Sequence, residues 1–338
     1  MTPKERGTVF VSGATGFIAL HIINNLLQQG YKVIGSARSQ EKVDHLLELF
    51  NNNPSLSLEI VPNIDNPEAF DDVFKKYGNE IKVVLHAASP IPRPSTDYEK
   101  EYLIPAVEGV KSILNAVKKY AANSVERVIL TSSAAAAQNS TDVVSEESWN
   151  DATWKGCQTD SWNAYAGSKT FAERAAWEFM EENKNVIKFT LTTVNPVYTL
   201  GPQAFSDKKF ASTSAYIEQI ISSTEDNITP KIAFWFVDVR DVAKAHILAF
   251  QNDNLVGKRL LLAADTFSYQ DVLNIANEDF KELNGKIPIG EPEKADALTK
   301  ENKGLLDNHK TKELLGFEFI GLRQCVDDSI KQILEVKH

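Results

Sequence analysis

A tyrosine and a lysine four residues apart could transfer a proton in an active site. Tyr165 and Lys169 lie in the stretch NAYAGSKTFAERAAWEF, which has the apolar spacing of a helix. On a helix the two side chains share one face, with Cβ atoms about 5 to 6 Å apart. A phenol with a pKa of about 10 is a poor acid at neutral pH, and a neighbouring ammonium group should lower that pKa. Ser133, at the end of the stretch ERVILTSS, could donate a hydrogen bond to the same substrate oxygen.

The stretch SGATGFIA has the residues that a dinucleotide site needs. Gly13 and Gly16 follow an expected strand and precede an expected helix, and Ala19 stands where a third glycine is common. Glycines let the backbone turn tightly and approach a pyrophosphate, which the N-terminus of a helix attracts. A glycine motif alone is equally compatible with a tight turn, but its place between strand and helix favours cofactor binding.

The charge after the second expected strand predicts which dinucleotide is bound. In NAD sites an Asp or Glu about 20 residues past the glycines accepts the ribose hydroxyls, whereas an Arg there accommodates a 2′-phosphate. Arg38 lies at that distance, and Lys42 follows one helical turn later. A solvated cation at a helix start is the alternative interpretation. The segment therefore predicts NADPH as the cofactor.

The elements that must position these residues alternate along the first two-thirds of the chain. Short β-branched runs predict strands at residues 8–13, 31–37, 56–62, 81–88, 126–133 and 188–196. Amphipathic stretches predict helices at residues 16–29, 40–51, 66–77, 99–121 and 163–183. The alternation predicts an α/β fold, a Rossmann-type doubly wound parallel sheet, in which ligands bind at the carboxyl ends of the strands.

Beyond Pro196 the alternation breaks and turn-forming and charged residues become frequent. We expect residues 1–196 to form mainly an NADPH-binding domain, with segments near 232–263 returning to it. Residues 197–338 should form mainly a smaller, loop-rich substrate-binding domain.

Composition narrows the class of protein. The 338 residues are 43% apolar and carry a formal net charge of −10, which argues against nucleic acid or an anionic membrane as a partner. No apolar run reaches the roughly 18 residues of a membrane span, and the first residues lack a signal-peptide pattern, so we expect a cytoplasmic protein. Neither the two cysteines nor the six histidines have a metal-binding spacing, so no metal site is expected. The expected form is a monomer or a homodimer.

Six motifs, SGATGFIA, HAASP, TSSAAA, YAGSK, NPVYTLGP and VDVRDVAKAH, occur in an order that resembles the extended short-chain dehydrogenase/reductase family. The resemblance covers nearly the whole chain. It is greatest to the branch that contains dihydroflavonol reductase, cinnamoyl-CoA reductase and fungal NADPH-dependent aldehyde and ketone reductases. A Tyr and a Lys at this spacing occur on many helices by chance, but this context implies a catalytic Ser133, Tyr165 and Lys169, with Lys169 also on the nicotinamide ribose.

The resemblance also implies where the cofactor lies. Asn63 stands where the family usually has an Asp that holds the adenine amino group, so this contact should be weaker. The expected cofactor-binding residues are Gly13, Thr15, Gly16, Phe17, Ile18, Arg38, Lys42, Asn63, Ile64, Ala87, Ala88, Ser89, Thr131, Tyr165, Lys169, Pro196 and Val197.

The expected reaction is transfer of a hydride from C4 of NADPH to the carbonyl carbon of an aldehyde, ketone or dicarbonyl. Tyr165 would supply the proton and Ser133 would orient the oxygen. Aromatic residues are more often plain core, but an apolar substrate pocket is expected from Ile91, Ala134, Tyr198, Trp235 and Phe236. The four alanines from Ala134 to Ala137 should make that pocket wide.

Two other functions are compatible with the same motifs. A nucleotide-sugar epimerase or dehydratase would share the fold and the Tyr–Lys pair, but such enzymes typically hold NAD with an acidic residue where Arg38 lies. A non-catalytic NADP-sensing regulator would commonly lack the catalytic tyrosine, which is present here. Bound NAD in the purified protein would favour the epimerase, and a turnover assay would decide against the regulator.

Overall fold

The computed structural model describes residues 6–89, 94–138, 143–206 and 212–336. Its centre is a seven-stranded parallel sheet in the order β3-β2-β1-β4-β5-β6-β9. The strands are β1 (Thr8–Ser12), β2 (Lys32–Ala37), β3 (Leu56–Ile60), β4 (Ile81–His86), β5 (Arg127–Thr131), β6 (Thr190–Pro196) and β9 (Arg259–Leu262). The predicted Rossmann-type doubly wound fold is confirmed.

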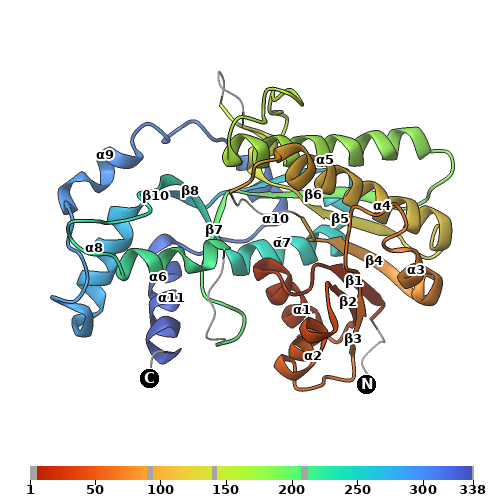
Figure 1. The fold of residues 1–338 in the computed structure, drawn as a ribbon, viewed down its shortest axis with the longest axis horizontal. Helices are drawn as coiled ribbons and strands as arrows, with labels where there is room; N and C mark the ends of the chain where they lie inside the picture. Colours follow the sequence, from red (N-terminus) through yellow and green to blue (C-terminus); the bar gives the residue numbers. More distant parts are fainter. Residues whose placement is uncertain (1–5, 90–93, 139–142, 207–211, 337–338) are drawn as a thin grey trace.

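Successive residues of each strand pack into two separate cores, one on each face of the sheet. In β1, Val9 and Val11 contact the cluster beneath the sheet, and Phe10 contacts the cluster above it. The lower face is covered by α1 (Phe17–Gln28), α2 (Gln40–Leu49) and α7 (Val239–Gln251), and the upper face by α3 (Asp71–Tyr77), α4 (Ile104–Tyr120) and α5 (Ser161–Asn183). Figure 1 shows α4 and α5 above the sheet and α1 and α7 below it. Both faces are thus buried, which explains the continuous apolar runs of the strands.

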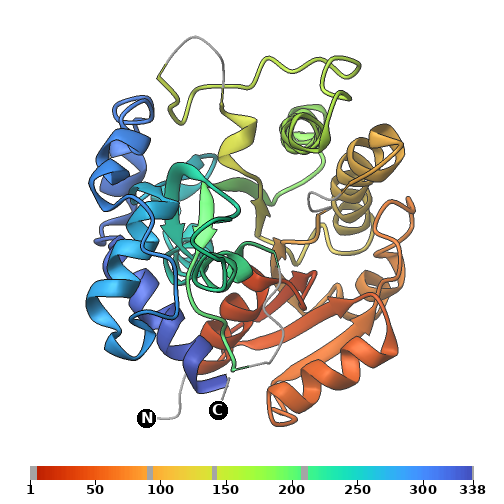
Figure 2. The ribbon, with the colours of Figure 1, turned by 60° about the vertical axis from the view of Figure 1, so that its left-hand side comes forward.

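A second unit packs beside the carboxyl-terminal edge of the sheet. Its own small sheet has the order β10-β8-β7, from β7 (Tyr198–Leu200), β8 (Ala233–Asp238) and β10 (Asp265–Ser268). Its helices are α6 (Tyr216–Ile221), α8 (Tyr269–Asp279), α9 (Ala295–Thr299) and α11 (Leu322–Val336). The helix α10 (His309–Leu315) packs instead against β9 of the large sheet. In Figure 2 the blue C-terminal helices gather along one side of the molecule, while α5 is seen nearly end-on above the sheet.

Several element boundaries differ from the sequence prediction, and two of the differences have evident local reasons. The strand expected to run to residue 88 ends at His86, because the Ala87 and Ala88 amides donate to the Ser12 side chain rather than to a neighbouring strand. The helix expected from residue 66 begins at Asp71, since the Asn66 side chain accepts the Glu68 amide and holds a turn there. Among the described helices, none is long and apolar enough to cross a membrane.

Candidate active site

The loop after β1 is shaped to receive a pyrophosphate. Gly13 has a φ of +66°, and a Cβ on it would lie 2.9 Å from the Ala88 Cα atom, so both conformation and space require glycine. Gly16 is the N-cap of α1, where no side chain caps the helix and no acidic residue occupies the first turn. The first amides of α1 are therefore available to a phosphate, as the sequence predicts.

A buried serine ties this loop to the end of β4. The Ser12 Oγ atom accepts the amides of Ala87 and Ala88, each at 3.1 Å, and lies 2.8 Å from the His86 Nδ1 atom. Because both amides donate to Ser12, its hydroxyl hydrogen points at His86. This arrangement fixes the two loops at the point where the strand order reverses, which is where doubly wound sheets bind nucleotides.

The cationic pair lies at the end of the neighbouring strand. Arg38 comes directly after β2, and Lys42 lies in the first turn of α2, whose N-cap Ser39 accepts the Lys42 amide. Both side chains are exposed, and within the described residues neither is in an ion pair. The Ala14 amide donates to the Ser36 carbonyl at 2.9 Å and so holds the glycine loop against the end of β2. The two positive charges are free to meet a phosphate at this edge.

The remaining expected cofactor residues follow the carboxyl edge of the sheet. Asn63 is exposed beyond the end of β3, and Ile64 lies against Gly109 of α4. The others lie in strand-end segments: Thr15, Phe17 and Ile18 at the start of α1, Ala87, Ala88 and Ser89 after β4, Thr131 closing β5, and Pro196 and Val197 at the end of β6.

The three candidate catalytic residues meet where β5 ends beneath α5. Ser133 accepts the Ala135 amide at 3.1 Å and hydrogen-bonds the Tyr165 phenol. The buried Lys169 Nζ atom donates to the Thr131 carbonyl at 3.3 Å and lies 5.9 Å from the centroid of the Tyr165 ring. Ser132, in contrast, points into the core and donates to Glu173. The structure therefore distinguishes two adjacent serines that the sequence alone leaves similar.

The electrostatics of this cluster differ from the sequence expectation in one respect. Burial raises the pKa of Tyr165 above its ordinary value, and the hydrogen bond from Ser133 only partly opposes this rise. Desolvation is the largest influence on the pKa of Tyr165 and the Ser133 hydrogen bond opposes it, so the lowering expected from Lys169 is not found. Burial also lowers the pKa of Lys169 to about 8, against the opposing influence of Glu173. A phenol that keeps its proton at neutral pH is suited to act as a general acid.

Comparison with known proteins identifies the family. The model of the NAD dependent epimerase/dehydratase family matches residues 9–263. The chain belongs to this family. It is similar to the NADPH-dependent methylglyoxal reductase of Saccharomyces cerevisiae, with 53% identity over 339 residues that cover 97% of this chain and 98% of that protein.

Solved structures of such reductases align over the whole molecule. The yeast methylglyoxal/isovaleraldehyde reductase complexed with NADPH gives a TM-score of 0.92 at 50% identity, covering 98% of this chain and 99% of that chain. The corresponding NADPH complex from Candida albicans gives 0.93 at 42% identity, covering 98% and 100%. The UDP-glucose 4-epimerase of Thermotoga maritima, at 19% identity and a TM-score of 0.71, shares the fold. The predicted resemblance to extended short-chain dehydrogenases/reductases is confirmed.

The residues expected to line the substrate pocket do not all lie where the sequence suggests. Ile91 lies outside the described residues. Tyr198 is partly exposed, and Trp235 keeps 7% of its surface exposed. Phe236 exposes no surface and packs against Phe267 in the core of the second unit, so its assignment to the pocket is corrected. Neighbouring residues of a strand face opposite sides, which is why Trp235 and Phe236 belong to different cores.

The alanine run that follows Ser133 is buried. Ala134 is 7% exposed and the next three residues are less so. Ala134 and Ala137 pack in the same cluster as Val144, Val197 and Trp235. The width of the pocket beside Ser133 stays a prediction.

Two aromatic residues beside Tyr165 escaped the sequence analysis. Trp162 is 47% exposed, and its ring lies 5.9 Å from that of Tyr165 with an angle of 34° between the planes. Phe234 meets Trp162 edge-on at 6.4 Å. The spacing of three residues between Trp162 and Tyr165 could have revealed the first contact. Trp162 thus gives Tyr165 an apolar neighbour, and Phe234 packs against Trp162.

Replacement of Tyr165 by Phe should lower kcat by about a hundredfold or more, because the proton donor is lost, while NADPH affinity changes little. Steady-state kinetics and a fluorescence titration with NADPH measure the two quantities. Tyr31→Phe is the matched control, since Tyr31 precedes β2 at the end of the sheet opposite the site and its hydroxyl accepts a hydrogen bond from Gln251 at 2.8 Å. Activity of Tyr165→Phe close to that of the control would show that another group donates the proton.

Proposed function

We propose that this chain is an NADPH-dependent carbonyl reductase that converts aldehydes, ketones and dicarbonyls of the methylglyoxal and 3-methylbutanal type into alcohols. The observation that carries the proposal is the meeting of Ser133, Tyr165 and Lys169 at the end of β5, on the same sheet edge as the glycine loop and Arg38. A relative that is 53% identical over 97% of this chain is named an NADPH-dependent methylglyoxal reductase, which confirms the predicted cofactor and reaction class.

The residues of the chain fit the cofactor and divide the reaction among them. NADPH, when bound, supplies the hydride from C4 of its nicotinamide ring. Tyr165 donates its proton to the carbonyl oxygen as negative charge develops there, and Ser133 holds that oxygen by a hydrogen bond. The Lys169 ammonium group binds the ribose hydroxyls and stabilises the phenolate left on Tyr165. A hydride and a proton thereby convert one carbonyl group into one alcohol.

The other functions considered from the sequence are less well supported. Arg38 occupies the position where an NAD-dependent epimerase needs an acidic residue, and the epimerase comparison at 19% identity concerns the fold alone. Tyr165 and Lys169, which a non-catalytic regulator would not need, lie together with Ser133.

The proposal also covers the organisation of the chain. Residues 1–196, with the segments near 232–263, bind NADPH, and residues 197–338 bind the substrate. The protein is a monomer or a homodimer and is located in the cytoplasm. The mechanistic roles assigned to the individual site residues also belong to the proposal.

The function is tested by following NADPH oxidation with 3-methylbutanal, methylglyoxal, an aryl ketone and UDP-glucose as candidate substrates. We expect turnover with at least one carbonyl compound and none with the nucleotide sugar. A purified protein that carries bound NAD and acts on UDP-glucose alone would contradict the proposal.

Arg38→Asp should raise the KM for NADPH by about tenfold or more and change the KM for NADH little, because only NADPH carries the 2′-phosphate. Lys188→Asp, an exposed charge reversal at the opposite end of the sheet, is the control. Equal effects of Arg38→Asp on the two cofactors would show that Arg38 does not bind the 2′-phosphate.

A further inference from the structure

A buried carboxylate lies one helical turn beyond Lys169. Glu173 exposes none of its surface, and the spacing of four residues places Tyr165, Lys169 and Glu173 along one face of α5. A charge is costly in the interior of a protein unless it is paired and hydrogen-bonded. Nothing in the reaction described above uses Glu173.

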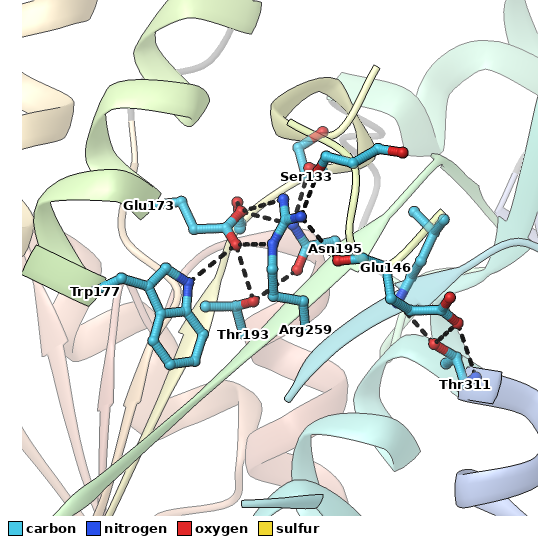
Figure 3. A network of polar contacts seen from close by, with 11 residues as sticks. Ser133, Glu146, Glu173, Trp177, Thr193, Asn195, Arg259 and Thr311 are labelled. Atoms are coloured by element: carbon cyan, nitrogen blue, oxygen red, sulfur yellow. Dashed lines mark hydrogen bonds and ion pairs between the residues drawn. The ribbon is translucent and has the colours of Figure 1, made fainter. Parts of the chain in front are cut away.

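Five donors surround the two oxygens of Glu173. Figure 3 shows Glu173 with Trp177, Thr193, Asn195 and Arg259 around it. Its Oε1 atom accepts from Arg259 Nε at 2.5 Å, Thr193 Oγ1 at 3.1 Å and Trp177 Nε1 at 3.3 Å. Its Oε2 atom accepts from Ser132 Oγ at 2.5 Å and Asn195 Nδ2 at 2.7 Å. The ion pair with Arg259 and the four further donors compensate the burial of this carboxylate.

Two of these donors, Ser132 and Asn195, come from the strand ends that build the active site. Ser132 directly precedes Ser133, and Asn195 Nδ2 also donates to the Ser133 carbonyl at 3.2 Å. Arg259, on β9, donates to the Ser148 carbonyl and stacks on the Trp149 ring at 3.9 Å. Glu173 therefore joins α5 to the ends of β5 and β6 and, through Arg259, to β9.

The charges around Lys169 are few in the part of the chain that the structure describes. From β4, His86 faces Lys169 as a neutral ring, since burial lowers its pKa to about 3. From α7, His246 lies 2.7 Å from Thr131 Oγ1 and is also neutral, with a pKa lowered to about 4 by burial. Tyr165 is a neutral phenol, and Arg259 from β9 forms its ion pair with Glu173. Glu173 is the anion that favours the charged form of Lys169.

We propose that Glu173 is a positioning residue for the catalytic cluster. Its carboxylate keeps Lys169 in the ammonium form and holds Ser132 in the core, so that Ser133 faces Tyr165. Arg259 limits this effect by compensating part of the charge. The inference rests on the proposed reductase function for the meaning of Lys169, but its test can be read from cofactor binding alone.

Because Glu173 and Arg259 carry opposite charges, removing one or the other should shift the pH dependence of NADPH binding in opposite directions. NADPH binding should weaken at alkaline pH as Lys169 loses its proton. We call this loss of affinity the alkaline limb of the pH profile. Glu173→Gln removes the favourable anion, so the midpoint of the alkaline limb should move down by about one pH unit. Arg259→Met leaves the anion uncompensated, so the limb should move up. The double variant, in which a neutral pair replaces the ion pair, should return close to the wild-type position.

The Kd of NADPH is measured by fluorescence from pH 6 to 10 in a Tyr165→Phe background, so that Tyr165 does not titrate. Glu178→Gln, the same substitution at an exposed position of α5, is the control and should leave the limb unchanged. Ser132→Ala should lower kcat severalfold in the otherwise wild-type enzyme without moving the limb. Glu173→Asp keeps the negative charge, so the alkaline limb of this variant should lie closer to that of the wild type than the limb of Glu173→Gln does.

Shifts of Glu173→Gln and Arg259→Met in the same direction, or none in either, would overturn the inference, because a purely structural role weakens binding equally at every pH. Should Arg259→Met fail to fold, the comparison of Glu173→Gln with Glu178→Gln and with the double variant still decides. A wild-type protein that does not bind NADPH at all would instead contradict the proposed function.

Discussion

The arrangement of the active site depends on the burial of one ammonium group. Lys169 lies almost wholly inside the protein, where a charge must find compensating partners. It finds the Thr131 carbonyl at the end of β5 and the field of Glu173 on its own helix. These contacts fix α5 over the strand end in one register. Tyr165, one turn earlier on the same face, is thereby placed against Ser133.

The doubly wound sheet supplies the rest of the site because its strands end along one edge. The ends of β1 and β2 present the glycine loop and two exposed cations, and Ser12 ties the first of these to the end of β4. The ends of β5 and β6 present Ser133 and the polar side chains that hold Glu173. The proposed sites for the nucleotide and for proton transfer therefore occupy neighbouring parts of a single edge.

Much of this organisation could be predicted from the sequence, since it depends on local patterns. Apolar runs predict the strands, and the spacing of Tyr165 and Lys169 predicts their shared helix face. The pairing of Glu173 with Arg259 could not be predicted, because it joins residues 86 positions apart through tertiary structure. Strand alternation likewise does not tell whether Trp235 or Phe236 faces the site when both faces of β8 meet a core. The raised pKa of Tyr165 depends on the depth of burial, which a sequence does not give.

The crystal structure of this protein with NADPH, at neutral pH, tests the central role of Lys169 most directly. The account predicts that the Lys169 ammonium group lies within about 3.2 Å of the nicotinamide ribose hydroxyls while Glu173 keeps its contacts with Ser132 and Arg259. It also predicts that the nicotinamide C4 atom faces the space between Ser133 and Tyr165. A nicotinamide ring bound away from Tyr165, with Lys169 contacting no part of the cofactor, would contradict it.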